Sequence, residues 1–428
     1  ILSGLVGSEM CIRDRFPDEP HELGAAHAVV KGDGDVVWPS VVRACMAGRP
    51  ERLYDGGHVS GNSFMPARWD LLPEGKYMWA SVQTVRGCPK HCSFCSVWRT
   101  DGQAPRQRGV DILVQEVVEL RRRGFRFIAL ADDNFYPVTL DDLAKAERRA
   151  DKTRYQELLA MRQERFALME ELAKLPDDLV MFTQITMEAA EDDAFLAAMR
   201  KARIRGARVG VEAVTPAGLK DVYKGFNLSG EDLIDRLKKF RAHGVHVLGS
   251  FIFGLPSDRP ETFDATVALA QQADLTFAQF VLLTPFPGTL DFDKWAADPA
   301  NAGMVDGVPV TRHWLIPEEK RPRLFTEHPA MSLEEIRLRT QQVWDEFYSW
   351  QFVWARARVA CVSLKARLAF VLISKLYRQM YANTGIATDS ARVQKSARSA
   401  RWLASMARRL FTAKPMPDLA VPTRAAVV

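Results

Sequence analysis

Cysteine is scarce in this sequence: there are six in 428 residues, and Cys11, Cys45 and Cys361 each stand far from any other cysteine. Small secreted scaffolds depend on many paired cysteines, so this class of protein is excluded. Long hydrophobic runs are also missing, because the most apolar stretch, residues 359–377, is interrupted by three cations. A membrane-spanning helix needs about 20 mostly apolar residues. The sequence therefore predicts a protein of a reducing compartment, the cytoplasm, without a membrane-spanning helix.

The chain does not begin with methionine, and residues 5–14 resemble a translated sequencing adapter. We therefore expect residues 1–15 to be an artefact and leave them out of the fold prediction. Charged residues from Glu9 onward interrupt the short apolar start, so it does not suit a signal peptide.

The charge is unevenly distributed. Apolar residues make up 47% of the chain and charged residues 26%, as in globular proteins of two or three domains, and the net charge is only +5. Residues 356–414, however, hold thirteen Lys or Arg against one acid, Asp389, with Trp402, Leu403, Met406 and Phe411 at helical spacing. This basic helix fits peripheral contact with an anionic membrane such as the inner membrane, contact with RNA, or simple solvation. RNA is the least favoured, and we do not expect a nucleic-acid partner. Residues 415–428 are expected to be a disordered tail.

The strongest motif is a group of three cysteines, Cys88, Cys92 and Cys95, spaced four and then three positions apart. Thiolates so close in sequence can hold one soft metal centre, and an iron-sulfur cube has four irons that each need a further ligand. Three cysteines leave one iron open to a substrate or cofactor. The alternative is a zinc knuckle, but structural zinc sites have a fourth ligand at regular spacing and only His91 is near.

This cysteine spacing, with the aromatic Phe94 before the third cysteine, resembles the radical SAM superfamily. The resemblance implies that Cys88, Cys92 and Cys95 hold a [4Fe-4S] cluster and that Phe94 lies at the cofactor site. It also implies that S-adenosylmethionine (SAM) caps the open iron and is cleaved to a 5′-deoxyadenosyl radical. The electron would come from a donor such as flavodoxin or ferredoxin, in a reducing cytoplasm.

Between residues 76 and 289 apolar strand-like runs alternate with helical patterns, which predicts an α/β fold with a parallel sheet. A full eight-stranded barrel would need more residues than this segment has. The resemblance therefore implies a partial (β/α)6 TIM-type barrel, the radical SAM core. The expected strands are Tyr77–Val85, Phe125–Ala131, Leu179–Ile185, Ala207–Glu212, Val245–Phe253 and Phe277–Leu283, and the expected helices Val110–Arg123, Leu140–Leu175, Asp192–Ala202, Ser229–His243 and Glu261–Ala273.

Candidate SAM contacts follow the predicted strands, because parallel barrels collect their chemistry at the carboxyl ends of strands. By resemblance, Asp132 and Asp133 after the second strand would contact the SAM amino group, and Gln184 ends the third strand. Glu212, in the pattern Gly-x-Glu, would approach the ribose, and Gly254 the adenine. Two alternatives stay open: the aspartates could cap a helix, and Glu212 could form a buried ion pair with Arg208 or Lys220.

The flanking segments are less informative. Residues 16–57 resemble the last strand and helix of a Rossmann-like cobalamin-binding domain, with a Gly-Asp turn at residues 32–35, although an ordinary αβ cap is the alternative. Residues 58–75 have linker composition. Residues 290–330 are expected to be an irregular lid or connector, and residues 331–414 a basic helical region.

The leading hypothesis is a cobalamin-dependent radical SAM enzyme that methylates an unactivated carbon of a small-molecule or lipid substrate. A radical SAM cyclase or oxidoreductase without methyl transfer is the second interpretation. A non-catalytic metal-binding or nucleic-acid-binding protein is the third, and it predicts zinc and no cleavage of SAM.

Overall fold

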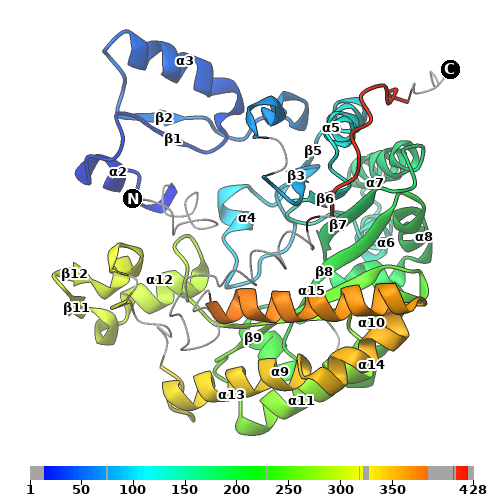
Figure 1. The fold of residues 1–428 in the computed structure, drawn as a ribbon. Helices are drawn as coiled ribbons and strands as arrows, with labels where there is room; N and C mark the ends of the chain where they lie inside the picture. The colour runs from blue at the N-terminus through cyan, green and yellow to red at the C-terminus, as the bar shows by residue number, and fades with distance from the viewer. Residues whose placement is uncertain are drawn as a thin grey trace.

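The computed structural model describes residues 14–73, 76–227, 230–317, 319–321, 327–383, 408 and 411–422. Its centre is a six-stranded sheet with the order β10-β9-β8-β7-β6-β3, in which all neighbouring strands are parallel (Figure 1). The predicted α/β fold with six parallel strands is confirmed. The strands are β3 (Ala80–Val82), β6 (Phe127–Leu130), β7 (Val180–Ile185), β8 (Ile204–Glu212), β9 (His246–Phe253) and β10 (Phe277–Leu282).

Helices lie between the strands and pack on one face of the sheet. Alternate strand residues, such as Met181 in β7 and Phe280 in β10, are fully buried in one core with the apolar faces of these helices. The helices of this core are α5 (Val110–Arg122), α7 (Lys152–Leu172), α8 (Asp193–Lys201), α10 (Gly230–Ala242) and α11 (Pro260–Gln272). Two further helices, α6 (Leu140–Arg148) and α9 (Pro216–Asp221), pack in smaller apolar clusters, and a 3-10 turn, η3, spans Met187–Glu191.

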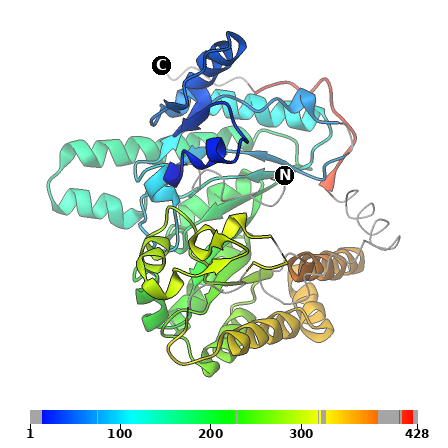
Figure 2. The same ribbon diagram turned by 90° about the vertical axis from the view of Figure 1, so that its left-hand side faces the viewer.

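The single helix predicted over residues 140–175 is in fact two helices, α6 and α7, which project from the molecule as a hairpin (Figure 2). Ala150 has a φ of 53°, which α-helical residues do not adopt, and the Asp151 side chain then accepts a hydrogen bond from the Arg154 N–H. A left-handed residue followed by an N-cap ends one helix and starts the next.

The outer edge of β10 is covered by α13 (Leu333–Phe347). The Trp344 indole N–H donates to the Phe280 carbonyl at 2.9 Å, and the Tyr348 hydroxyl donates to the Ala278 carbonyl at 2.8 Å. The Ala278 N–H in turn donates to the Tyr348 hydroxyl at 3.1 Å. These contacts satisfy backbone groups that an edge strand would otherwise present for pairing with another chain. The region ends in α14 (Trp350–Ala360) and α15 (Leu364–Asn383).

A separate N-terminal unit consists of α2 (Glu19–Glu22), β1 (Val29–Lys31), α3 (Gly34–Met46) and β2 (Leu53–Asp55), and β1 pairs with β2 in parallel. The strand and helix predicted here are confirmed, and β2 was not predicted. Two carboxylates at the start of α3 bind the core: Arg86 donates to Asp33 and to Asp35, and Arg106 donates to Asp33. Both arginines lie on the short hairpin of β4 (Val85–Arg86) and β5 (Arg106–Gln107).

The connecting segments are more ordered than the sequence suggests. Residues 290–317, expected to be irregular, contain α12 (Leu290–Ala297) and the hairpin of β11 (Met304–Val305) and β12 (Val308–Pro309). Residues 411–422 lie against α5 and β6, although disorder was expected from residue 415: the Met416 N–H donates to the Arg122 carbonyl. The short elements are α4 (Val97–Thr100), η1 (Gly61–Ser63), η2 (Trp69–Leu71), η4 (Pro299–Asn301) and η5 (Val310–Leu315). Among the described helices, none is long and apolar enough to span a membrane.

Candidate functional site

The three clustered cysteines lie on a loop that leaves β4 and ends at α4. The Ser93 N–H donates to the Val222 carbonyl at 3.3 Å, and the Ser93 hydroxyl donates to Asp291 at the start of α12 at 3.0 Å. At the start of the loop Gly87 has a φ of 91°, and a Cβ there would lie 2.9 Å from the Gly102 carbonyl oxygen. Only glycine fits that turn, which brings the loop back toward the sheet.

The thiols of Cys88, Cys92 and Cys95 are unbonded to any other cysteine and largely buried. Burial raises the pKa of Cys92 to about 11 and that of Cys95 to about 12, and it also raises the pKa of Cys88. The charge of Cys88 contributes to the raised pKa of Cys92, and the charges of Cys92 and Cys88 contribute to that of Cys95, so the loop places the three thiols near one another. Nothing in the sequence indicated how strongly burial would disfavour the thiolates.

Soft donors of this kind fit an iron-sulfur cluster. Within the described ranges no three His, Cys, Asp or Glu side chains converge on a single ion. A cube spreads its thiolates over separate irons, so it does not require such convergence. Because the buried thiols hold their protons at neutral pH, the metal must displace these protons when the cluster assembles.

Asp132 and Asp133 follow β6 but play different parts. Asp132 is buried and accepts from the Thr84 N–H, the Thr84 hydroxyl and the Val85 N–H at 2.5–2.9 Å, so both of its oxygens hold the turn between β3 and β4. Asp133 accepts from the Gly87 N–H at 2.7 Å, and burial raises its pKa to about 6. Asp133 therefore lies directly beside the cysteine loop, and Asp132 holds the backbone that leads into this loop.

Glu212 ends β8 in an unusual conformation. The β8–β9 register shifts between Gly210 and Glu212, and Glu212 has a φ of 65°. A bulge re-aims the side chain that follows it, and positive φ in a residue with a Cβ is strained. The carboxylate is buried and pairs with the Lys224 ammonium at 2.9 Å. The ion pair considered from the sequence exists, but its cation is Lys224 and neither Arg208 nor Lys220.

The remaining predicted residues lie at the same sheet edge. The Gln184 amide donates to the Asp133 carbonyl at 3.3 Å, and its oxygen accepts from Arg208 at 3.2 Å. Gly254 follows β9 with a φ of 88°, and its N–H donates to the buried Asp258 at 2.9 Å. Phe94 packs on an apolar cluster that joins the ends of β9 and β10 with the loops after β8 and β10, Ala213, Leu219, Val222, Ile252, Leu255 and Leu283.

Sequence analysis missed Lys224, Arg208 and Asp258 as parts of this site. A lysine twelve residues after a Gly-x-Glu pattern is a weak signal, because nothing in the sequence shows that the chain returns to the strand end there. Arg208 was considered only as an ion-pair partner. In the structure the Arg208 guanidinium donates hydrogen bonds to the Gln184 side-chain oxygen and to the Ser250 hydroxyl, each at 3.2 Å.

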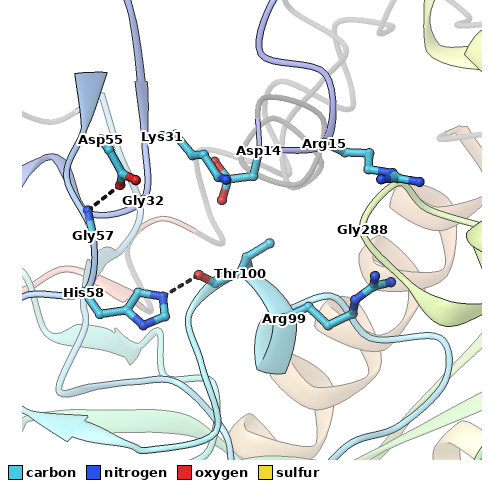
Figure 3. A pocket seen from close by; sticks show the side chains of 10 residues that line it. All are labelled: Asp14, Arg15, Lys31, Gly32, Asp55, Gly57, His58, Arg99, Thr100 and Gly288. Atoms are coloured by element: carbon cyan, nitrogen blue, oxygen red, sulfur yellow. Dashed lines mark hydrogen bonds between the residues drawn. The ribbon is translucent and has the colours of Figure 1, made fainter. Parts of the chain in front are cut away.

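A cavity of about 420 Å³ lies between the N-terminal unit and the segment after the cysteine loop (Figure 3). Its walls come from the carboxyl ends of β1 and β2, from α4 and from Gly288; the lining residues are Asp14, Arg15, Lys31, Gly32, Asp55, Gly57, His58, Arg99, Thr100 and Gly288. His58 and the Thr100 carbonyl, 2.9 Å apart, connect the two walls. Nothing in the sequence indicated this cavity.

The fold and the site together define an α/β protein that carries a loop of three free thiols at the carboxyl ends of the strands of a parallel sheet. Residues 82–270 match the model of the radical SAM superfamily. The resemblance to the radical SAM superfamily that the cysteine motif indicated is thereby confirmed.

The chain is 28% identical over 290 residues to an uncharacterized methyltransferase of Pyrococcus horikoshii, which covers 63% of this chain and 58% of the relative. It is 25% identical over 230 residues to the hopanoid C-2 methylase of Rhodopseudomonas palustris, which covers 53% and 39%. The chain thus spans about half the length of these curated relatives.

Among solved structures, the chain is similar in fold to TsrM from Kitasatospora setae, a radical S-adenosylmethionine methyltransferase solved with cobalamin and a [4Fe-4S] cluster bound. The TM-score is 0.59 at 17% identity, and the match covers 86% of this chain and 80% of that one.

Proposed function

We propose that this chain forms the radical SAM core of a methyltransferase that uses cobalamin to methylate an unactivated carbon. The observation that carries the proposal is the loop of three largely buried thiols beside Asp133 and Glu212. The names of the relatives support methyl transfer over the other radical reactions. Because the chain spans only about half the length of the curated relatives, methyl transfer is proposed for the whole protein and not for this chain alone.

The residues of the chain divide the work. Cys88, Cys92 and Cys95 hold the cluster, which when bound supplies the electron that cleaves SAM to methionine and a 5′-deoxyadenosyl radical; that electron comes from a donor such as flavodoxin or ferredoxin. Asp133 offers a carboxylate to the SAM ammonium, and Glu212 accepts from the ribose hydroxyls. No side chain can generate a carbon radical of this strength, so the protein contributes position and charge.

Two finer points of architecture belong to this proposal. The sheet pairs its strands in sequence and leaves β3 and β10 unpaired with each other, which is the arrangement of a partial (β/α)6 barrel. The β1–α3–β2 unit is proposed to be the end of a cobalamin-binding domain, because ligands of parallel α/β sheets bind outside the carboxyl ends of the strands.

The cavity in Figure 3 is then the part of the cobalamin site that this chain supplies. It lies at the carboxyl ends of β1 and β2 and borders α4, which directly follows the cysteine loop. Lys31 and Arg99 line it, and cations of this kind suit the phosphate of cobalamin. Gly32 permits the close approach of the two strand ends, because a Cβ there would lie 2.6 Å from the Gly57 carbonyl oxygen.

The proposal is tested by anaerobic reconstitution with iron and sulfide, followed by iron analysis and an assay for 5′-deoxyadenosine. We expect about four irons per chain, SAM cleavage, and loss of both in Cys92→Ala. Cys361→Ala, a change of the same residue on the far helical region, is the control and should bind iron normally. SAM labelled in its methyl group then separates methyl transfer from cyclase or oxidoreductase chemistry. A protein that binds zinc in place of iron and leaves SAM intact contradicts the proposal.

Peripheral contact with a membrane, and with it a lipid substrate, is a second proposal. Residues 384–407, 409 and 410 of the predicted basic region lie outside the described residues, so this proposal rests on the corner between α14 and α15. At this corner Val362 is 96% exposed, Leu364 62% and Leu368 56%, with Lys365 also exposed between them. The sequence has no acid from residue 347 to residue 388. Protruding aliphatic side chains with basic neighbours fit an anionic lipid surface.

Flotation with vesicles tests this surface. The protein is expected to float with phosphatidylglycerol vesicles and not with phosphatidylcholine vesicles, and Val362→Glu with Leu364→Glu should abolish flotation. Met46→Glu, which places the same charge on another exposed apolar residue, 83% exposed on α3, is the control. A protein that stays in the bottom fraction with both kinds of vesicle removes the support for a lipid substrate.

A further inference from the structure

Lys224 is a charged residue that no part of the reaction described above uses. It follows α9 and is only 6% exposed. Its ammonium donates to the Glu212 carboxylate at 2.9 Å and to the Gly210 carbonyl at 2.8 Å. A buried ammonium is costly unless several acceptors surround it, so this position is built for the charge.

We propose that Lys224 is a positioning residue with two effects: its ammonium fixes the Glu212 carboxylate, and its charge beside the cysteine loop favours the reduced form of the cluster. The inference rests on the proposed function, since it concerns the cluster that the loop would hold.

The first effect follows from the strain at Glu212. With its φ of 65° and the bulge before it, Glu212 needs an interaction that compensates for its backbone conformation. The ion pair with Lys224 supplies this interaction and leaves the second carboxylate oxygen for a ligand. Gly210 leaves room for the pair: a Cβ there would lie 2.4 Å from the Glu212 oxygen and 2.5 Å from the Lys224 nitrogen, so a larger residue would displace the ends of both side chains.

The second effect follows from the position of the segment that carries Lys224. The Ser93 N–H, between Cys92 and Cys95, donates to the Val222 carbonyl, two residues before Lys224. Lys224 and Lys90 of the cysteine loop also lie over the same ring, that of Phe226, at 5.9 and 4.7 Å. Backbone and side-chain contacts thus hold the ammonium next to the loop.

Of the two cations at the Phe226 ring, Lys224 is the more deeply buried: its side chain is 7% exposed, against 16% for that of Lys90. Lys90, the other cation of the loop, is bound to Glu188 at 2.8 Å. Reduction adds one electron from the donor to the cluster, and a nearby cation stabilises that added negative charge strongly where water is excluded.

The test is an EPR-monitored redox titration of the reconstituted protein with dithionite as the reductant. In Lys224→Met the cluster is expected to be about tenfold harder to reduce, which is about 59 mV more negative for a one-electron couple. Lys224→Arg keeps the charge and should restore most of the difference. The control is Lys174→Met, which removes the cation of the Lys174–Glu171 pair, a contact of 2.6 Å. This pair lies between the end of α7 and the start of β7, at the amino ends of the strands.

A second variant keeps the test open if Lys224→Met alone misfolds, because that change leaves the Glu212 charge buried without a partner. The double variant Lys224→Met with Glu212→Gln removes both charges and should shift the midpoint in the same direction by a smaller amount. If the clusters assemble and their midpoints match that of the unmodified protein, Lys224 does not act on the cluster. If the unmodified protein takes up no iron, the proposed function fails first.

Discussion

The six-stranded core and the β1–α3–β2 unit differ in how far they bury their apolar side chains. In the core, helices cover the sheet, and α13 closes the outer edge of β10 with Trp344 and Tyr348. In the N-terminal unit the helix α3 buries only Val41, while Trp38 is 57% and Met46 83% exposed. The core encloses its own apolar surface, and the N-terminal unit does not.

The difference shows what holds each part in place. Burial of large side chains stabilises the core, where Trp344 and Phe280 are fully enclosed. Two strands and one helix cannot bury enough area to be stable alone. The N-terminal unit instead relies on charge, through Asp33 and Asp35 bound to Arg86 and Arg106. Changes in packing should therefore affect the core, and changes in charge or pH the N-terminal unit.

The largest effect is expected for Trp344→Ala. The change empties a buried site and leaves the Phe280 carbonyl at the β10 edge without its indole partner. The cost should be about 4 kcal/mol of unfolding free energy, measured by urea denaturation. Trp350→Ala is the matched control, because that ring is 70% exposed and its removal should change little. Equal costs in the two variants would mean that α13 does not close the sheet.

Much of the core could be predicted because its pattern is local. Alternating apolar residues located β7 and β10, and their bounds in the structure differ by one residue or less at each end. The site was predictable where its residues lie close together in the sequence at a characteristic spacing, as Cys88, Cys92 and Cys95 do. Such signals need no knowledge of which segments meet in space.

The rest depends on contacts between distant segments. Lys224 joins the site only because a bulge turns Glu212 toward it, and a bulge leaves no mark in the pattern of apolar residues. Phe411 was predicted to lie on a basic helix, and it is helical, but it packs on the core: its carbonyl accepts from the Arg126 N–H and its ring lies 5.2 Å from that of Phe127. Neither contact could be inferred from composition.

A smaller effect is expected from Asp33→Ala, and it should be confined to the N-terminal unit. The carboxylate is 5% exposed and is the common partner of Arg86 and Arg106. Its loss leaves the Arg106 guanidinium without an acid and Arg86 with Asp35 alone, and should cost about 3 kcal/mol. Hydrogen exchange should show faster opening of α3 with α11 unchanged. Asp70→Ala, which breaks an exposed pair with Arg68, is the control; faster exchange in α11 as well would contradict the separation.

Lowering the pH should change the stability of the two parts in opposite directions: it should destabilise the N-terminal unit and stabilise the core. Burial raises the pKa of Asp33, but the bonds from Arg106, Val59 and Arg86 outweigh it and leave this pKa below its usual 3.8. Its contribution is present above that value and is lost as the pH falls through the lowered pKa. In the core, burial raises the pKa of Asp258 to about 6, so the native state holds an extra proton between about pH 4 and 6 and the core is stabilised as the pH falls through this range.

Hydrogen exchange corrected for the intrinsic effect of pH measures both responses in one sample. Between pH 6 and 4 the protection of α11 should rise by about 2 kcal/mol while that of α3 stays constant. Below pH 4 the protection of α3 should fall first. Asp258→Asn should remove the first change and leave the second, and a common response of α3 and α11 throughout would mean that they open as one unit.

The smallest effect is expected for Met46→Ser on the exposed face of α3. Because the side chain is 83% exposed, the change should alter the unfolding free energy by less than about 0.5 kcal/mol. The same change in the core, Met199→Ser on α8, removes a side chain with no exposed surface and should cost about 3 kcal/mol. If Met46→Ser proved as costly as Met199→Ser, something would have to cover α3. The N-terminal unit would then be stabilised by burial as the core is, and the contrast between packing and charge would disappear.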